Sequence, residues 1–217
     1  MPVEDKWGFD KWAETYDNDI FDTSRPDQFT FRGYRRVLEK VVEYADLDSN
    51  HYTRILDIGI GTGNLACLFL PCGLEVTGID PSPEMMKICR RKHPEIPVML
   101  GDFLGIPLPP KSIDLIVSSY AFHHLTAEEK AGAVREMKRV LRPAGCIVIA
   151  DLMFRNAAER NRIENTFRQT GRNDIVEEYE NEYPGYFEDL VKVFEKAGFS
   201  TDGEQLTDSV WIIRGQL

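Results

Sequence analysis

The segment from Leu56 to Asn64 constrains the fold of this chain more than any other part of its sequence. It reads Leu-Asp-Ile-Gly-Ile-Gly-Thr-Gly-Asn, begins inside a short strand pattern at Arg54–Ile58 and leads into a helical pattern over residues 65–70. Glycines at this spacing let the backbone turn tightly and let a ligand approach without a Cβ in the way. The N–H groups of such a loop and the start of the following helix favour a carboxylate or a phosphate. The segment therefore indicates a ligand-binding turn between a strand and a helix.

Short apolar runs alternate with helical patterns through residues 53–150. Strands are expected at Arg54–Ile58, Glu75–Ile79, Val98–Leu100, Ile113–Ser118 and Cys146–Ala150. Three helices are expected between these strands. The first covers residues 65–70 and is stopped by Gly73, and the second begins after the N-cap Ser82, with Pro83 at its first position. The third runs from the capping box at Thr126–Glu129 to about Leu141. Strands that alternate with helices build βαβ units and a parallel sheet that is covered on both faces.

The two ends of the chain differ from this central part. Residues 1–50 read as helices, because Phe9, Trp12 and Tyr16 recur at helical spacing and a second apolar pattern runs from Tyr34 to Ala45. Residues 151–217 are less regular, with a helix at Tyr186–Lys196 closed by Gly198, and a hairpin that pairs Glu204–Leu206 with Val210–Ile213. We therefore expect a single α/β domain over residues 1–217: a helical cap (1–50), a cofactor-binding core (53–150), and a substrate-side segment with closing antiparallel strands (151–217).

Composition narrows the class of partners. With 26 Lys and Arg against 36 Asp and Glu, the chain carries a net charge of −10, which disfavours nucleic acid. The longest apolar stretch, residues 65–70, is far shorter than the about 20 residues that span a bilayer, and the N-terminus lacks the pattern of a signal peptide. The four cysteines form no C-x-x-C pair, which is typical of free thiols in a cytoplasmic protein. We expect a monomer or a homodimer with no membrane partner.

Asp80 indicates which class of ligand the glycine loop binds. It follows Gly63 by seventeen residues and stands at the end of the next predicted strand. A carboxylate at that place can accept two hydrogen bonds from the vicinal hydroxyls of a ribose. The loop and Asp80 together indicate a nucleoside-containing cofactor. The alternative is that the glycines only form a tight turn and that Asp80 is a solvated acid.

The spacing of the loop is G-x-G-x-G, not the dinucleotide pattern G-x-G-x-x-G. In this it resembles the first motif of the class I S-adenosylmethionine-dependent methyltransferases. Gly101-Asp102-Phe103 matches the segment whose acid contacts the adenine amino group in that family, and Ile113–Ser119 matches its fourth strand. The resemblance implies a doubly wound, Rossmann-like methyltransferase fold that binds S-adenosyl-L-methionine and releases S-adenosyl-L-homocysteine.

One turn departs from the pattern of the family. Residues 141–145, Leu-Arg-Pro-Ala-Gly, match the turn before the fifth strand, which usually contains Pro-Gly-Gly. Because alanine disfavours a positive φ, we expect none at Ala144, and Gly145 can supply one if the turn requires it.

More narrowly, the chain resembles the YrrT family of methyltransferases. The residues that carry this resemblance are Trp12–Asp17, Phe31–Tyr34, Gly61–Leu65, Ser118–Thr126 and Val210–Ile212. The family's ligand positions carry over as Gly59, Asp80 and Asp102. The full set assigned to the cofactor site is Asp57, Gly59, Gly61, Gly63, Asp80, Asp102, Phe103 and Ser119.

His123, His124 and Tyr16 are the candidate catalytic residues. The histidines follow the fourth strand, near the carboxyl ends of the strands, where one of them could take a proton from an acceptor hydroxyl or thiol. Alternatively they only shape the entry to the next helix. No metal is expected, since adjacent residues rarely converge on one ion and the sequence shows no third ligand.

Tyr16 belongs to a segment with two interpretations. Residues 1–30 combine aromatic residues, which need burial, with acids, which favour water. In the family resemblance this segment covers the cofactor, so it could dock as a lid when ligand is present. Trp12 and Tyr16 could instead be ordinary core residues of a packed helix.

The sequence leaves the methyl acceptor open. Ser119-Tyr120-Ala121-Phe122 stands where many nitrogen-methylating enzymes carry an acid or Asn followed by Pro-Pro-Tyr, which disfavours a base or amide nitrogen as the acceptor. Acids interleave with aromatic residues over 177–189, as a wall for a cationic acceptor or as a solvated face. We predict an S-adenosylmethionine-dependent methyltransferase that acts on a small molecule by in-line transfer. A nicotinamide-dependent oxidoreductase and a non-catalytic S-adenosylmethionine-binding module stay as alternatives.

Overall fold

The computed structural model describes residues 8–21, 31–49 and 51–217. The remaining parts of the predicted lid segment 1–30, at residues 1–7 and 22–30, lie outside the described residues. The helices are α1 (Phe9–Phe21), α2 (Tyr34–Ala45), α3 (Pro83–Lys92), α4 (Ala127–Val140), α5 (Ala157–Gln169), α6 (Asn173–Asn181) and α7 (Phe187–Lys196), with the 3-10 helices η2 (Ala66–Cys72) and η3 (Phe122–His124). The strands are β1 (Arg54–Ile58), β2 (Glu75–Asp80), β3 (Val98–Leu100), β4 (Ile113–Ser119), β5 (Leu141–Phe154), β6 (Gly185–Tyr186), β7 (Ser200–Gln205) and β8 (Val210–Gln216).

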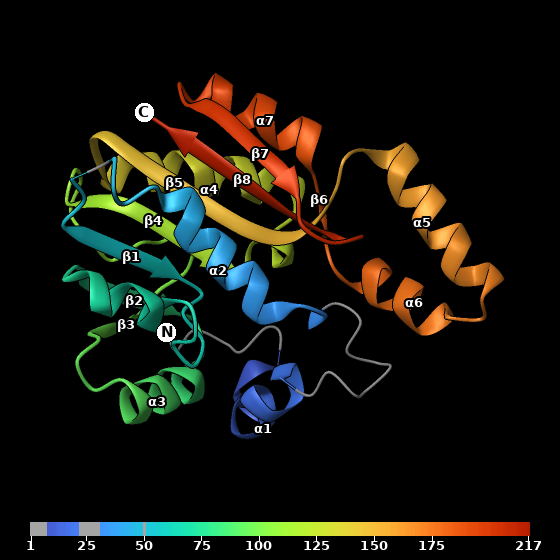
Figure 1. Cartoon of the computed structure of the whole chain (residues 1–217), viewed down its shortest axis with the longest axis horizontal. Coiled ribbons are helices and arrows are strands. Elements are labelled where there is room, and N and C mark those ends of the chain that lie inside the picture. The colour runs from blue at the N-terminus through green and yellow to red at the C-terminus, as the bar shows by residue number, and fades with distance from the viewer. Residues whose placement is uncertain (1–7, 22–30, 50) are drawn as a thin grey trace.

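The strands of the described residues form a mixed sheet in the order β3-β2-β1-β4-β5-β8-β7, and the short β6 pairs with β5 (Figure 1). The strands from β3 to β5 are parallel to one another, whereas β8 is antiparallel to both β5 and β7. The predicted α/β fold, with a mostly parallel sheet and an antiparallel C-terminal hairpin, is confirmed. The strand order reverses between β1 and β4, so a crevice lies at the carboxyl ends of these two strands. Open α/β sheets bind their ligands in such a crevice.

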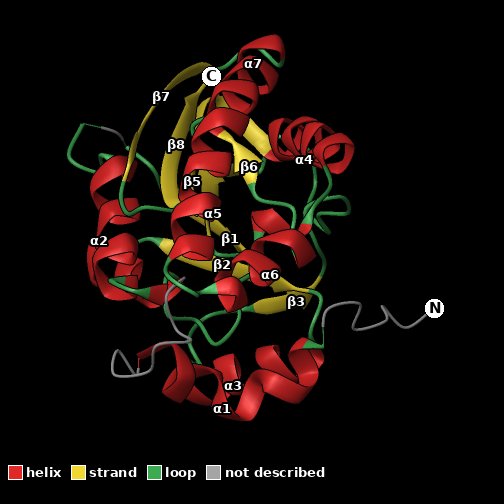
Figure 2. Ribbon diagram, turned by 90° about the vertical axis from the view of Figure 1, so that its right-hand side faces the viewer, coloured by secondary structure: helices red, strands yellow, loops and turns green. Residues whose placement is uncertain are grey.

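Alternate residues of the central strands pack on opposite faces of the sheet. Ile55 of β1 belongs to a core cluster with Val37 and Val41 of α2, while its neighbour Leu56 belongs to a second cluster with Val134 of α4. Figure 2 shows α2 and α4 on opposite sides of the strands. The central strands are therefore buried on both faces, as their continuous apolar runs predict.

Local signals in the sequence set several element boundaries. The Ser82 side chain accepts a hydrogen bond from the Met85 N–H at 3.1 Å and begins α3. Thr126 and Glu129 form both bonds of a capping box at the start of α4. The helix expected over 65–70 is the 3-10 helix η2, and it ends where Gly73 adopts φ 73°. None of the helices in the described ranges is long and apolar enough to cross a membrane.

The segment after β5 is more regular than the sequence indicates. Residues 151–154 extend β5, and α5 and α6 occupy a stretch that is only expected to be irregular. Few apolar residues mark these helices, because they bury only a small cluster around Phe154, Ile163 and Tyr179. Two helices that cover so little of the core leave a weak periodic signal.

The expectation for Ala144 is wrong. Ala144 adopts φ 61°, in the left-handed region, and Gly145 is not among the residues with positive φ. Gly145 is instead required by space, because a Cβ there would lie 2.9 Å from the Arg142 carbonyl oxygen and 3.1 Å from that of Asp114. Residues 141–145 are not a turn before the fifth strand but the first part of β5, where the register with β4 shifts, and the left-handed residue of this segment is Ala144, at a steric cost of roughly 1–2 kcal/mol for a residue that carries a Cβ.

Candidate functional site

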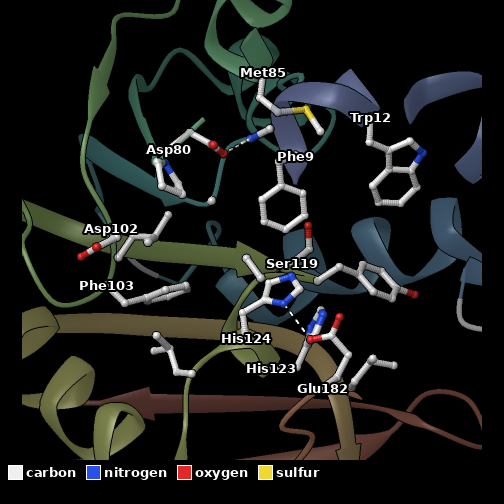
Figure 3. A pocket seen from close by; sticks show the side chains of 18 of the residues that line it. Phe9, Trp12, Asp80, Met85, Asp102, Phe103, Ser119, His123, His124 and Glu182 are labelled. Carbon is white, nitrogen blue, oxygen red and sulfur yellow. Dashed lines mark hydrogen bonds and ion pairs between the residues drawn. The ribbon is translucent and has the colours of Figure 1, made fainter. Parts of the chain in front are cut away.

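A cavity of about 390 Å³ lies at the carboxyl ends of the parallel strands (Figure 3). Of the predicted cofactor residues, Gly59, Gly61, Asp80, Asp102, Phe103 and Ser119 line it. All of the predicted catalytic residues, Tyr16, His123 and His124, line it as well. The topology thus brings together residues that are spread over more than a hundred positions of the sequence, and the described part of the wall contains no Lys or Arg.

The glycine loop holds its shape through the backbone of β2. The N–H groups of Gly59 and Ile60 both donate to the Ile79 carbonyl, at 2.9 and 3.1 Å. Gly59 adopts φ 72°, and a Cβ there would lie 2.5 Å from the Cβ of Ala121. No other residue type fits this position without a shift of the segment after β4.

Asp80 supports the loop and faces the cavity. One carboxylate oxygen accepts the Gly61 N–H at 2.8 Å, and the other accepts the Ser82 N–H at 2.8 Å. The residue is 5% exposed, and Figure 3 shows its carboxylate at the wall of the cavity. Each carboxylate oxygen can accept more than one hydrogen bond, so Asp80 keeps acceptor capacity toward a ligand.

Asp57 and Gly63 do not line the cavity. Asp57 is 1% exposed, and its Oδ2 has no hydrogen-bond partner among the described residues. Burial, and then the charge of Asp80, raise the pKa of Asp57 to about 8. At Gly63 a Cβ would lie 2.7 Å from the His93 ring and 2.9 Å from the Cys89 sulfur, so this glycine lets the loop pack on α3. Their roles toward a cofactor stay predictions.

Asp102 and Phe103 form the far wall of the cavity. The Asp102 Oδ1 accepts the N–H groups of Leu104 and Gly105, both at 2.8 Å, and so closes a tight turn after β3. The Phe103 ring, 5% exposed, meets the Phe122 ring edge-on at 5.1 Å. This wall is apolar with one carboxylate at its rim, a surface that suits a flat ring with an amino group.

Helix α1 covers the cavity on the side of α3. Phe9, Trp12 and Tyr16 of α1 line the cavity, and Ala13 packs with Met85 of α3. The expected N-terminal cap is therefore formed by α1, because α2 packs against the sheet. Burial raises the pKa of Tyr16 well above its ordinary value, so its hydroxyl stays protonated at neutral pH. Tyr16 can donate a hydrogen bond but is a poor base.

Two carboxylates fix α1 in place. Asp17 accepts hydrogen bonds from Thr62 Oγ1 at 2.6 Å and Asn64 Nδ2 at 2.9 Å, and it pairs with Lys92 at 2.6 Å. At the start of the helix, Asp10 accepts the Ser82 hydroxyl at 2.5 Å. The sequence places Asp17 on the expected lid, but its partners lie 45 or more positions away and no local pattern reveals them.

The two histidines take different partners. His123 Nδ1 lies 2.5 Å from Asp151 Oδ1, and His124 Nδ1 lies 2.8 Å from Glu182 Oε2 (Figure 3). Glu182 is one of the acids over 177–189 that the sequence analysis considers, whereas Asp151 is a functional candidate that it does not single out. The sequence does contain a feature that could have identified Asp151. This acid directly follows the apolar run Cys146–Ala150, and a buried carboxylate needs a partner.

These partners move the two histidine pKa values apart. Burial lowers the pKa of His123, but the charge of Asp151 and the hydrogen bond to it outweigh burial, so the net shift is upward. Burial and then the charge of His123 lower the pKa of His124, and Glu182 only partly compensates. Of the two rings, His123 therefore holds a proton more strongly.

Glu182 also brings a third potential metal ligand to the pair. One ligand atom from each of His123, His124 and Glu182 lies within 4.8 Å of the others. The described hydrogen bonds join His123 Nδ1 to Asp151 and His124 Nδ1 to Glu182. We therefore interpret the group as two hydrogen-bonded pairs and assign no metal to it.

Comparison with known proteins places these features in a family. Residues 56–149 match the family of methyltransferase domains. An uncharacterized methyltransferase of Oceanobacillus iheyensis is 38% identical over 94% of this chain and 93% of its own length. The uncharacterized methyltransferase YrrT of Bacillus subtilis is 36% identical over 94% of each chain.

A solved structure supports the same fold. Phosphoethanolamine N-methyltransferase 2 of Haemonchus contortus, in complex with S-adenosyl-L-methionine, superposes with a TM-score of 0.69 at 17% identity. The match covers 98% of this chain and 58% of that one. At this identity the likeness concerns the fold alone.

Proposed function

Because the chain belongs to the YrrT-type family of class I S-adenosylmethionine-dependent methyltransferases, we propose that it methylates a small-molecule acceptor with S-adenosylmethionine as the donor. The observation that carries the proposal is the position of Asp80. Its carboxylate lies at the cavity wall and is fixed by the Gly61 N–H, so the acid and the glycine loop form one unit. This unit suits a ribose with an attached amino-acid moiety.

The residues on the cavity wall fit this donor. Gly59 lines the cavity and has no room for a Cβ, because the loop packs against Ala121 at this point. We assign the ribose to Asp80, the adenine to Asp102 and Phe103, and the amino-acid moiety to the backbone around Gly59 and Gly61. The assignment of adenine to Asp102 follows the family resemblance, and the apolar surface around Phe103 is consistent with a flat ring.

The chemistry requires orientation and a dry site. When bound, S-adenosylmethionine supplies an electrophilic methyl group on a positively charged sulfonium. The chain's own contribution is to hold the acceptor in line and to exclude water. Phe9, Trp12 and Tyr16 of α1 supply an apolar cover for this purpose, while Tyr120 and Leu152 bound the acceptor end.

The acceptor pocket restricts the charge of the acceptor. Of the acids over 177–189, Glu178 and Glu182 line the cavity, which supports an uncharged or cationic acceptor more than an anionic one. The Haemonchus contortus enzyme is named for phosphoethanolamine, an acceptor that carries a phosphate. The described wall here offers no Lys or Arg to pair with such a group.

Calorimetry with S-adenosylhomocysteine and with NAD tests the donor. We expect binding of the first and none of the second, and tighter binding of NAD would favour the oxidoreductase alternative. A methyl-release assay over a metabolite library then separates an enzyme from a non-catalytic binding module. Release of S-adenosylhomocysteine in the presence of one acceptor class supports the proposal. Binding without release from any acceptor would favour the module.

A further inference from the structure

We propose that His123 is the general base of this site, that Asp151 is its positioning residue, and that the acceptor carries its proton on the attacking atom as a phenolic hydroxyl or a thiol. The inference rests on the proposed methyltransferase function and names its substrate class. It is carried by the geometry of one buried pair at the acceptor end of the cavity, where His123 lines the wall (Figure 3).

Asp151 is built into the structure as a fixed carboxylate. It lies in β5, directly after Ala150, which pairs with the last residue of β4, and is 1% exposed. Its Oδ2 accepts the backbone N–H groups of Phe122 and, at 2.9 Å, His123, while its Oδ1 accepts the Leu152 N–H at 2.6 Å. Three backbone donors leave this carboxylate no freedom to turn, and they favour its ionised form.

The orientation of Asp151 fixes the tautomer of His123. An ionised carboxylate only accepts hydrogen bonds, so the 2.5 Å contact requires that His123 Nδ1 carries a proton. In the neutral ring the lone pair then sits on Nε2, for which the described residues provide no hydrogen-bond partner. A histidine with one nitrogen held by a buried acid and the other at a ligand cavity has the arrangement of a general base.

The groups around the ring favour His123 over His124 for this role. His124 donates or accepts through Nδ1 at Glu182, and its ring packs against Phe9 at 5.0 Å. The groups that face His123 are Asp151 from β5, His124 beside it, Glu182 after α6 and Lys130 from α4. Lys130 donates to the carbonyl groups of Leu125 and Tyr183, and burial lowers its pKa to about 8. Two carboxylates therefore face the ring against one weakened cation.

The proposed step is balanced without any further reagent. The acceptor oxygen or sulfur forms a bond to the methyl carbon, and the bond from that carbon to the donor sulfur breaks with its electron pair moving to that sulfur. The proton of the acceptor goes to His123 Nε2. The positive charge that leaves the sulfonium reappears on the imidazolium, next to Asp151. An acceptor without a proton, such as a thioether or a pyridine, would need no base.

The first experiment reads the tautomer without any turnover. Nitrogen-15 NMR of the four histidines, assigned with single variants, should show His123 protonated at Nδ1 and titrating above the usual histidine pKa. In Asp151→Asn the titration midpoint should fall, whereas the exposed control His51→Gln should leave it unchanged. A proton on Nε2 in the neutral ring, or a midpoint that ignores Asp151→Asn, would overturn the positioning role.

The second experiment uses His123→Gln and three probe acceptors: phenol and phenylmethanethiol, which keep the proton of the attacking atom at neutral pH, and pyridine, which has none there. We expect roughly 10²- to 10⁴-fold slower methylation of the phenol or thiol, with pyridine, if it reacts, unaffected. For wild type the rate should rise with pH to a plateau, because only neutral His123 accepts a proton, and Asp151→Asn should move the midpoint down. Three outcomes would overturn the proposal. In the first, His123→Gln slows methylation of all probes equally; in the second, wild type methylates pyridine alone; in the third, wild type binds S-adenosylhomocysteine but methylates no probe. If the wild-type protein does not bind S-adenosylhomocysteine at all, the proposed function itself is refuted.

Discussion

Asp17 of α1 accepts a 2.6 Å hydrogen bond from the hydroxyl of Thr62, in the middle of the glycine loop. Thr62 stands between Gly61 and Gly63, so the carboxylate couples the position of the covering helix to the conformation of the loop. Asn64 and Lys92 bind the same carboxylate and bring in the end of α3. The helix that covers the cavity and the loop that lines it therefore form one hydrogen-bonded assembly.

Removing the charge of Asp17 should loosen α1. In Asp17→Asn the three donors lose a charged acceptor, and we expect a loss of about 1 kcal/mol because solvent partly screens the site. This corresponds to roughly fivefold faster amide exchange over residues 12–17. Hydrogen exchange measures it, with the exposed Glu14→Gln on the same helix as the control. Unchanged exchange in Asp17→Asn would show that apolar packing alone holds α1.

A cofactor should tighten the same assembly. We expect S-adenosylhomocysteine to slow amide exchange over residues 59–64 and also over Trp12–Asp17, because both segments line or hold the cavity. The measurement compares exchange with and without the ligand. If only residues 59–64 respond, α1 is a fixed part of the core, and a gating role for Tyr16 should be abandoned.

Gly59 should tolerate no side chain. Gly59→Ala places a Cβ 2.5 Å from that of Ala121 at a positive φ, so the loop or the segment after β4 must move. We expect lower stability and loss of S-adenosylhomocysteine binding, measured by urea unfolding and calorimetry. Gly132→Ala, within α4, is the matched control: its Cβ would meet only side-chain ends, Leu104 at 3.4 Å and Arg135 at 3.8 Å, so alanine should be neutral or stabilise by up to about 1 kcal/mol. Wild-type binding by Gly59→Ala would contradict the close approach.

The sequence predicts what depends on neighbours along the chain and misses what depends on packing. Ser82 and the capping box of α4 act within a few residues, and continuous apolar runs mark the buried strands, so these elements are confirmed. The pair of His123 with Asp151 depends on the register of β4 with β5, which no local pattern encodes. For the same reason the partners of Asp17 could not be predicted. At Ala144 the space around Gly145 outweighs the preference of alanine for negative φ.

Asp80→Ala should weaken cofactor binding and also the fold. The sequence alone suggests little loss of stability, but Asp80 accepts two backbone N–H groups and is 5% exposed. Leaving these donors unpaired should cost about 1–3 kcal/mol of unfolding free energy. The affinity for S-adenosylhomocysteine should fall by roughly 10- to 150-fold, the value of a hydrogen bond to a charged group. Glu75→Gln, at the exposed start of β2, is the control, and unchanged affinity of folded Asp80→Ala would remove the ribose assignment.

Asp57 should make the stability of the protein depend on pH in the neutral range. Burial and the charge of Asp80 raise its pKa from 3.8 to about 8, so between these values the native state binds a proton that the unfolded chain has lost. The contribution of this group is therefore fully present below about pH 4, falls as the pH rises and is lost above pH 8. Asp57→Asn removes the titration. The unfolding free energy of the variant minus that of wild type should therefore increase from pH 5 to 8, by at most about 1.4 kcal/mol per pH unit. Urea unfolding from pH 5 to 9 measures this gain, with the exposed Asp48→Asn as the control, and parallel curves for wild type and Asp57→Asn would show that Asp57 stays ionised in the fold.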